Sequence, residues 1–275
     1  MAGDAVDPAL RRAVLAEAAV AFAGVPGIEV IDEGDLVRSF APGRAQPYVN
    51  AIARLRLGVD ADVQAVAARI RAVEAGYRQA GLPTLWWLDD DTRPIGLAAT
   101  LASLGLRDAG GEAVMAIALG SEAPTWPAGT EAVAVRVVDT IGDLDAWIAV
   151  IAGAYGWSDP ARAELMRGLY DPRLPHGRDE RRIQVLGLVD GVAVSAASLF
   201  RAAGQGWITN VGTVPAARGR GAGGAVTVAC LRLAAERGDP TAWLAASTMG
   251  EPVYARLGFQ TVGRLEHLLG PAPAR

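Results

Sequence analysis

The 275-residue sequence has no lysine, only one cysteine and no apolar run long enough to cross a membrane. Because all 26 basic residues are arginine, mechanisms that use a lysine nucleophile or a lysine Schiff base are excluded. The single cysteine, Cys230, rules out an intrachain disulfide and a cysteine-based metal cluster, which favours a reducing cytoplasm. A membrane-spanning helix needs about 18 consecutive apolar residues, and no such run occurs.

The overall composition is that of a globular protein rather than of one that coats nucleic acid. Hydrophobic residues make up 51% of the chain, charged residues 20%, and the formal net charge is -4. The segment "RRAVLAEAAVAFAGV" near the start resembles a signal peptide, but Glu17 interrupts its apolar run and Asp4 and Asp7 precede it. We therefore expect a helix there, and neither nucleic acid nor a membrane as a partner.

Two segments of the chain match each other in order and in chemistry. "GLPTLWWL" at 81–88 and "GDPTAWLA" at 238–245 both read Gly-x-Pro-Thr-x-Trp, and "LASLGLRDAGG" is echoed later by "YARLGFQTVGR". Each half reads as a helix ending at a glycine, a Trp-bearing strand, a short helix, a Leu-Gly turn and a last strand. The first helices of the two halves are expected at 65–80 and 225–237. The order predicts a duplication, although helix, glycine and strand also follow one another in unrelated α/β proteins.

The two halves are expected to meet in "GSEAPTWPAGTE" at 120–131, where Pro124, Pro127 and Gly129 interrupt both helix and strand patterns. This predicts one domain at 1–127 and a second at 128–275. The halves differ ahead of their first helix. The first has "LRLGVDADVQAV", with one glycine and two aspartates, whereas the second has "VPAARGRGAGG", with four glycines and two arginines.

The loop at 214–224 has the composition of a phosphate-binding loop. A helix N-terminus offers unpaired N–H groups and a partial positive charge, glycines allow close approach, and Arg218 and Arg220 add full charges. A P-loop would need a lysine, and a dinucleotide-binding GxGxxG loop would need more β-α units after it than remain here. The third signature, R/Q-x-x-G-x-G/A, is filled by residues 218–223 as R-G-R-G-A-G.

With this loop and "PVYARLGF" at 252–259, the segment 131–270 resembles the GNAT superfamily of acetyl-CoA-dependent N-acetyltransferases. Residues 131–138 fit the first strand of that fold, 142–169 its first two helices, and 182–200 its first hairpin, which turns at Asp190 and Gly191. The first half resembles the C-terminal part of the same fold without the cofactor loop, as in tandem members. The resemblance implies an α/β (α+β) protein with two GNAT-like lobes, each a mixed, mostly antiparallel sheet flanked by helices.

The resemblance also implies a site for acetyl-CoA that needs no metal. Tyr254 is the expected catalytic residue, which protonates the leaving thiolate, although a tyrosine that simply packs in the core is the alternative. Ser247 stands where many relatives carry an asparagine that contacts the cofactor. The residues expected to bind the cofactor are Gly212, Thr213, Val214, Arg218, Gly219, Arg220, Gly221, Ala222, Gly223, Gly224 and Ser247.

The sequence leaves the general base and the acceptor pocket open. An alkylammonium has to lose a proton before it attacks, and the strand at 206–214 carries no acidic residue. The candidate bases are Glu266, His267, Glu164, Asp159 and His176. The aromatic residues Trp147, Tyr155, Trp157 and Tyr170 fall where relatives shape the acceptor pocket, which would suit a small molecule with a ring or chain beside its amine.

Three functions compete on these observations. The first is transfer of an acetyl group from acetyl-CoA to the primary amine of a small molecule, by direct attack in a ternary complex, with the first half as a non-catalytic partner. The second is a CoA-binding module without transfer activity that serves in sensing or assembly. The third is a dinucleotide-dependent enzyme, which the missing β-α units disfavour. A duplicated chain of this kind is compatible with a monomer or a homodimer.

Overall fold

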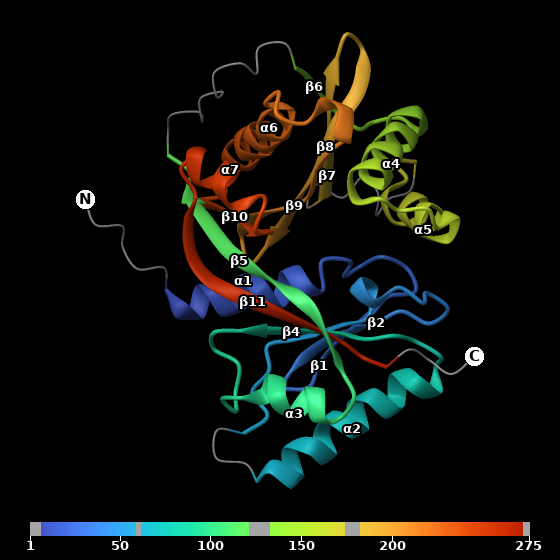
Figure 1. The fold of residues 1–275 in the computed structure, drawn as a ribbon, viewed down its shortest axis with the longest axis vertical. Coiled ribbons are helices and arrows are strands. Elements are labelled where there is room, and N and C mark those ends of the chain that lie inside the picture. The colour runs from blue at the N-terminus through green and yellow to red at the C-terminus, as the bar shows by residue number, and fades with distance from the viewer. Residues whose placement is uncertain (1–6, 59–61, 121–132, 174–181, 272–275) are drawn as a thin grey trace. The chain divides into compact units, whose positions relative to one another are not determined.

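The structure is a computed structural model that describes residues 7–58, 62–120, 133–173 and 182–271 (Figure 1). The chain forms two compact units. The first consists of Met1–Ala113 and Val262–Arg275, and the second of Val114–Thr261. Within the described residues, no helix is long and apolar enough to span a membrane, and no group of three or more His, Cys, Asp or Glu side chains is placed to hold a metal ion.

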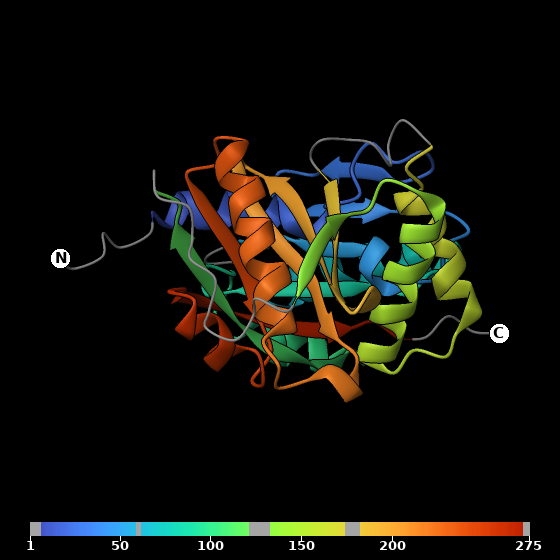
Figure 2. The same cartoon turned by 90° about the horizontal axis from the view of Figure 1, so that it is seen from above.

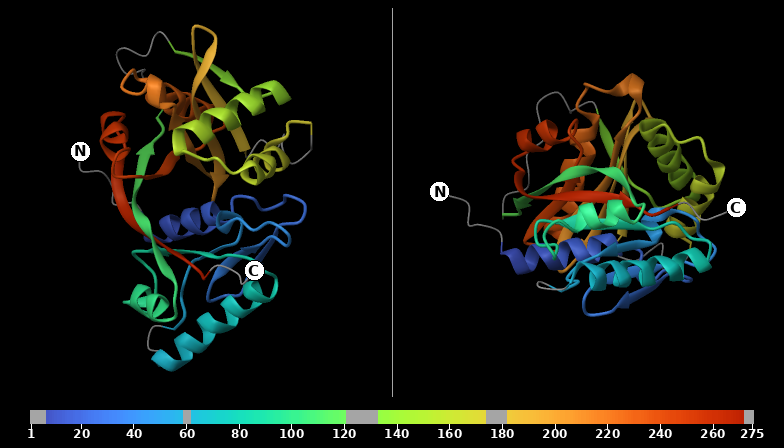
Figure 3. Two further views of the ribbon diagram at one scale, coloured as in Figure 1. Left: turned by 45° about the vertical axis from the view of Figure 1, so that its right-hand side comes forward. Right: turned by 60° about the horizontal axis from the view of Figure 1, so that its bottom comes forward.

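The first unit is a mixed, mostly antiparallel sheet with helices on both faces. Its elements are α1 (Pro8–Ala19), β1 (Glu29–Asp32), β2 (Val37–Phe40), η1 (Pro47–Val49), β3 (Ala51–Ala53), α2 (Val63–Gln79), β4 (Leu85–Asp89) and α3 (Leu97–Ser103). Neighbouring strands in the order β1-β2-β3 are antiparallel, and β3 and β4 are parallel. Figure 3 shows α1 and α2 on opposite faces of these strands, and each helix packs in its own hydrophobic cluster.

The helix α2 forms because its apolar residues recur on one face. Val66, Ile70, Val73 and Tyr77 follow one another at spacings of three or four residues, and all four are buried. Gly81 ends the helix in a left-handed conformation, with φ +69°. The chain then turns into β4, where Trp86, the first Trp of the repeated motif, packs in the same hydrophobic cluster as these four residues.

The second unit repeats this arrangement with longer strands. Its elements are β6 (Ala134–Val137), α4 (Ile141–Tyr155), α5 (Pro160–Tyr170), β7 (Arg182–Val189), β8 (Val192–Ala202), β9 (Gln205–Thr213), η2 (Pro215–Ala217), α6 (Ala222–Glu236), β10 (Thr241–Ala246) and α7 (Glu251–Arg256). Strands β6 to β9 are antiparallel, and β9 and β10 are parallel. Asp190 and Gly191, with φ +50° and +78°, form the predicted turn between β7 and β8.

Helices cover both faces of the second sheet, as Figures 1 and 2 show for α6 on one face and α4 and α5 on the other. On the α6 face, Ser195 Oγ of β8 donates a hydrogen bond to Ala222 O at 3.0 Å. On the α4 face, Trp147 Nε1 donates to Ala197 O at 3.0 Å. Each unit is thus a mixed, mostly antiparallel sheet flanked by helices, which confirms the predicted fold class.

Two strands contain residues of both units, and they follow the short helices α3 and α7. β5 (Arg107–Ala118) begins in the first unit and ends in the second, where it neighbours β10. Leu119 N also donates to Pro240 O at 2.8 Å, directly ahead of β10. β11 (Gln260–Leu269) begins in the second unit and pairs with β4 in the first, with Leu265 opposite Asp89 and Leu269 opposite Leu85. The last strand predicted for each half therefore supplies residues to the unit built mainly from the other half.

The predicted boundary between residues 127 and 128 falls in 121–132, outside the described residues. The contact-based units differ from a single cut there, because they place 114–120 with the second unit and 262–275 with the first. The first unit also contains β1, β2 and β3 ahead of its helix α2, although the resemblance covered only the C-terminal part of the fold. α6 begins at Ala222, three residues before the helix predicted at 225.

Candidate active site

A cavity of about 480 Å³ lies in the second unit, where β9, α6 and α7 approach the end of α4. Glycine and other small residues make up much of its wall. The residues that line it are Ala154, Tyr155, Val211, Gly212, Thr213, Ala217, Arg218, Gly219, Gly221, Ala222, Gly223, Gly224, Ser247, Met249, Gly250, Val253, Tyr254 and Arg256. The predicted phosphate-binding loop and the predicted catalytic tyrosine thus line one cavity.

The loop presents an uncapped helix N-terminus to this cavity. Gly221 is the N-cap residue of α6 and has φ +77°, a conformation that a residue with a Cβ rarely adopts. Within the described part of the chain, no side chain forms a capping hydrogen bond there. The N–H groups of the first turn, together with the positive end of the helix dipole, are the features that bind phosphate groups.

Arg218 connects the loop to two neighbouring elements. Its Nε donates to Thr213 O at 3.2 Å, at the end of β9, and its Nη2 donates to Ala154 O at 2.9 Å, near the end of α4. These bonds occupy two of the three guanidinium nitrogens. In this structure Arg218 therefore holds the loop against β9 and α4, in addition to lining the cavity.

Gly212 allows α4 to approach β9 closely. A Cβ at this position would lie 2.8 Å from the Cβ of Ala154, which is closer than real side chains come. Tyr155, the next residue of α4, donates from its hydroxyl to Val211 O at 3.1 Å. The end of α4 is thereby fixed along the strand that leads into the phosphate-binding loop.

The strands β9 and β10 are paired over only part of their length. Their register runs from Gly206 opposite Ala242 to Ile208 opposite Leu244, whereas β9 continues to Thr213 and β10 to Ala246. In the described residues, the cavity-side ends of the two strands are therefore not joined by a ladder. Asn210, with φ +52°, lies in this part of β9, where the register with β8 also shifts.

Tyr254 projects into the cavity from a packed position on α7. Only 8% of its surface is exposed, and its ring meets that of Phe259 edge-on at 5.9 Å. A Cβ at position 250 would lie only 3.0 Å from Cε2 of Tyr254, so the glycine there leaves room for the ring. Ser247 Oγ accepts a hydrogen bond from Gly250 N at 3.3 Å and lines the same cavity.

Two residues predicted to bind the cofactor are not among those that line the cavity. Val214 donates its N–H to Val194 O at 3.0 Å, and its side chain packs against Gly153. Arg220 is exposed, between two glycines with positive φ. The cavity also has lining residues that the sequence reasoning did not select as cofactor contacts, above all Arg256 and Met249. Arg256 lies inside the quoted "PVYARLGF" motif, so its basic side chain beside Tyr254 was a sequence signal for a further contact with an anionic ligand.

The aromatic residues proposed for the acceptor pocket take different places. Trp147 and Tyr170 are almost completely buried and meet edge-on at 5.4 Å, as core residues do. Tyr155 lines the cavity, and its ring stacks with that of Trp157 at 5.5 Å. The guanidinium carbon of Arg162 lies over the Trp157 ring, 3.3 Å from its centre.

The candidate bases are not brought together at the cavity of the second unit. Asp159 caps α5 by accepting from Ala161 N at 3.0 Å, and Glu164 is exposed on that helix. His176 lies outside the described residues. Glu266 and His267 belong to the first unit through β11.

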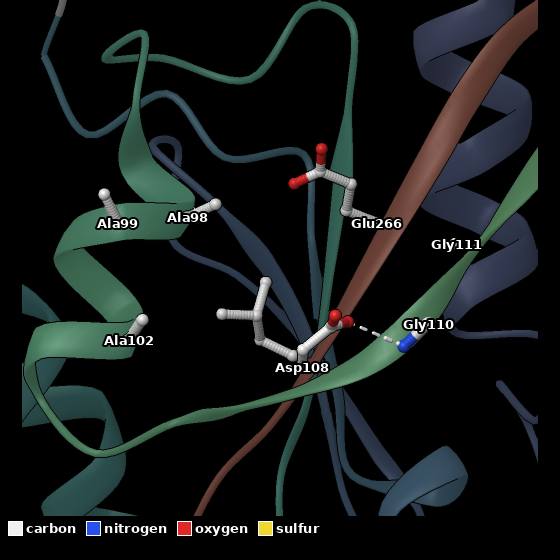
Figure 4. A pocket seen from close by; sticks show the side chains of 8 residues that line it. Ala98, Ala99, Ala102, Asp108, Gly110, Gly111 and Glu266 are labelled. Atoms are coloured by element: carbon white, nitrogen blue, oxygen red, sulfur yellow. Dashed lines mark hydrogen bonds between the residues drawn. The ribbon is translucent and has the colours of Figure 1, made fainter.

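Glu266 lines a separate cavity of about 450 Å³ within the first unit. Figure 4 shows its carboxylate and that of Asp108 near the alanine side chains of α3. Both carboxylates are exposed, and Asp108 Oδ1 accepts from Gly110 N at 2.8 Å. His267 is mostly buried against Trp87, with ring centres 5.1 Å apart.

Comparison with known proteins identifies the family of the second unit. Residues 138–262 match the family model described as an acetyltransferase (GNAT) domain. A GCN5-related N-acetyltransferase from Kribbella flavida superposes with a TM-score of 0.72 at 24% identity, covering 97% of each chain. A GCN5-related N-acetyltransferase from Sphaerobacter thermophilus gives a TM-score of 0.60 at 19% identity, covering 96% of this chain and 92% of that one.

A tandem GNAT protein from the clavulanic acid biosynthesis pathway also shares the fold. Its TM-score is 0.57 at 15% identity, with 91% of this chain and 85% of that chain covered. A search of curated protein sequences found no match. The family model and the shared fold agree with the loop and tyrosine motifs, and residues 138–262 of this chain form an acetyltransferase domain of the GNAT superfamily.

Proposed function

We propose that the second unit transfers an acetyl group from acetyl-CoA to the primary amine of a small molecule, by direct attack in a ternary complex. The observation that carries this proposal is the single cavity lined by both the glycine-rich loop and Tyr254. GNAT acetyltransferases use acetyl-CoA as their co-substrate. The lining residues fit such an anionic molecule, because two are arginines and none of those described is acidic.

The loop would hold the diphosphate of acetyl-CoA. The N–H groups of the first turn of α6 carry no side-chain cap, and the helix dipole favours negative charge at this end. The small lining residues Gly219, Gly221, Ala222, Gly223 and Gly224 leave the backbone accessible from the cavity. Arg218 would stabilise the loop through its bonds to Thr213 O and Ala154 O and would offer its remaining nitrogen to the ligand.

The ends of β9 and β10 that are not paired with each other would hold the thioester. Backbone N–H groups that are not used in a sheet ladder can donate to the thioester oxygen as negative charge develops on it. The amine nitrogen attacks the carbonyl carbon and the carbon–sulfur bond breaks. Tyr254 donates its proton to the leaving sulfur and recovers one from water, while the proton lost by the amine passes to water.

Calorimetry and a thiol-release assay test this function. Acetyl-CoA, CoA and NADH are titrated into the full chain, and CoA thiol release is then followed across a panel of small primary amines. We expect acetyl-CoA to bind and at least one amine to release thiol. Binding without release on any amine favours the non-catalytic CoA-binding module, and binding of NADH alone contradicts the proposal.

We propose further that the first unit binds no acetyl-CoA. The segment ahead of α2 has one glycine where the second unit has four, and it carries two aspartates where the loop of the second unit has none. Negative charge at this position opposes phosphate binding. The titration should therefore give one acetyl-CoA per chain, and two equivalent sites would contradict this proposal.

A further inference from the structure

Arg256 is a basic residue of the cavity wall that comes from a different element than the phosphate-binding loop. It ends α7, two residues after Tyr254, and its side chain is exposed. In the described part of the chain, no carboxylate lies within salt-bridge distance of its guanidinium. The charge of Arg256 is therefore available to a molecule that enters the cavity.

The charges of the cavity wall single out this residue. Arg218 and Arg256 are the two arginines that line the cavity, and the described lining residues include no acid. Arg218 already donates to Thr213 O and Ala154 O. Arg256 is thus the lining arginine whose guanidinium carries no such backbone bonds.

Acetyl-CoA brings two kinds of phosphate to this wall. The diphosphate matches the uncapped amides at the start of α6, because its negative charge is distributed over several oxygens that can each accept a backbone N–H bond. The 3′-phosphate is a monoester, which carries a charge of about -1.5 to -2 at neutral pH. A dianion gains most from a guanidinium that can bind it through two parallel hydrogen bonds.

Resting on the proposed function, we infer that Arg256 binds the 3′-phosphate of acetyl-CoA and makes the second unit select CoA over dephospho-CoA. The loop then accounts for the diphosphate, and Arg256 for the phosphate that distinguishes the two cofactors. Because Arg256 is exposed and is expected to contact a phosphate far from the reacting thioester, it contributes to affinity and selectivity rather than to the transfer step.

The test compares acetyl-CoA with acetyl-dephospho-CoA by calorimetry on the full chain. Wild type should bind acetyl-CoA about tenfold more tightly, which corresponds to one charge-assisted interaction. Arg256→Gln should bind the two cofactors within about twofold of each other, and Arg256→Lys should keep part of the preference. The ratio is taken within each variant, so a general loss of folded protein does not change it.

Arg71→Gln is the matched control, because Arg71 is exposed on α2 of the first unit. It removes the same charge and should retain the wild-type ratio. An Arg256→Gln variant that keeps the full preference, or that weakens binding of both cofactors equally, overturns the inference. Failure of wild type to bind acetyl-CoA at all would instead contradict the proposed function, so the two failures are distinct.

Discussion

Tyr254 combines packing with access to the cavity, and this combination makes its role testable. The ring is held by Phe259 and only 8% of the residue is exposed, so Tyr254→Phe should preserve the fold. Removing the hydroxyl removes the proposed proton donor and should lower kcat by about 100-fold. The dissociation constant of acetyl-CoA, measured by calorimetry, should change less than about threefold. An unchanged kcat would assign Tyr254 to packing alone.

His267 is a residue whose burial produces a dependence of stability on pH. Its side chain is 13% exposed, its Nε2 has no hydrogen-bond partner among the residues that the structure describes, and burial lowers its pKa to about 4. The unfolded chain, with a histidine pKa of about 6.5, binds the proton more readily than the folded protein does. The free energy of unfolding therefore keeps its full value above about pH 6.5. It falls by about 3 kcal/mol in total as the pH is lowered towards 4.

Urea unfolding at pH 7 and pH 5 measures this effect, and about 2 kcal/mol should be lost between them through His267. In His267→Gln that part of the difference should disappear. Glu112 lies 3.8 Å from His267 Nδ1, and burial raises the pKa of its carboxyl, which acts in the opposite direction. Glu112→Gln should therefore keep the loss of stability at pH 5. An equally steep pH dependence in His267→Gln would rule out this origin.

At the scale of elements, the contact between α4 and β9 depends on the absence of a side chain at Gly212. In Gly212→Ala the new Cβ would meet the Cβ of Ala154 at 2.8 Å, so the helix would have to move from the strand. We expect a loss of stability of about 1–3 kcal/mol, together with weaker binding of acetyl-CoA, because Tyr155 and Ala154 line the cavity.

Gly76→Ala is the control for this substitution, because Gly76 lies inside α2 with no neighbour within 4 Å of its Cβ position. There the change should stabilise the protein by about 0.5–1 kcal/mol, since alanine favours the helix. Denaturant midpoints of the two variants should therefore shift in opposite directions. A Gly212→Ala variant as stable as wild type would mean that α4 is not held in this position.

Local sequence patterns predicted where individual strands and helices lie better than they predicted which strands pair with one another. The Trp-bearing strand predicted in "GDPTAWLA" is β10, since Gly238 and Pro240 precede the strand and the apolar run "AWLA" lies within it. The pairing of β11 with β4 was not predictable in the same way. Apolar alternation along β11 shows which side chains face a core, but it is the same whichever strand lies alongside.

Sequence patterns had a similar limit at the candidate active site. The spacing of glycines and arginine predicted where the loop begins and that α6 follows it. The spacing could not show that the turns at Gly219 and Gly221 leave Arg220 outside the cavity wall, because that depends on backbone dihedral angles. Arg256 was missed because the side that a residue of a short helix presents depends on tertiary packing.

At the scale of the whole molecule, the sharing of β5 and β11 predicts that the two halves do not fold separately. A fragment of residues 1–127 keeps β3 beside β4 but lacks β11, the strand that pairs with the other edge of β4. A fragment of residues 128–275 keeps β9 beside β10 but lacks β5, the strand that neighbours the other edge of β10. Each would expose an unpaired strand edge, which favours aggregation. We expect each fragment alone to be insoluble or unfolded by circular dichroism.

Co-expression of the two fragments is the complementary experiment, because it supplies both missing strands. The fragments should then purify together as a folded complex that binds acetyl-CoA. A stable, monomeric fragment 128–275 with full acetyl-CoA binding would instead support two independent domains that meet near residue 128.

The course of β11 also has a consequence for protein synthesis. The ribosome completes β4 early, but the residues that pair with it, from Leu265 to Leu269, emerge only after every residue of the second unit. The amino-terminal unit is therefore the last to be completed, and the nascent chain has to keep the exposed side of β4 from other partners until translation of that stretch has ended.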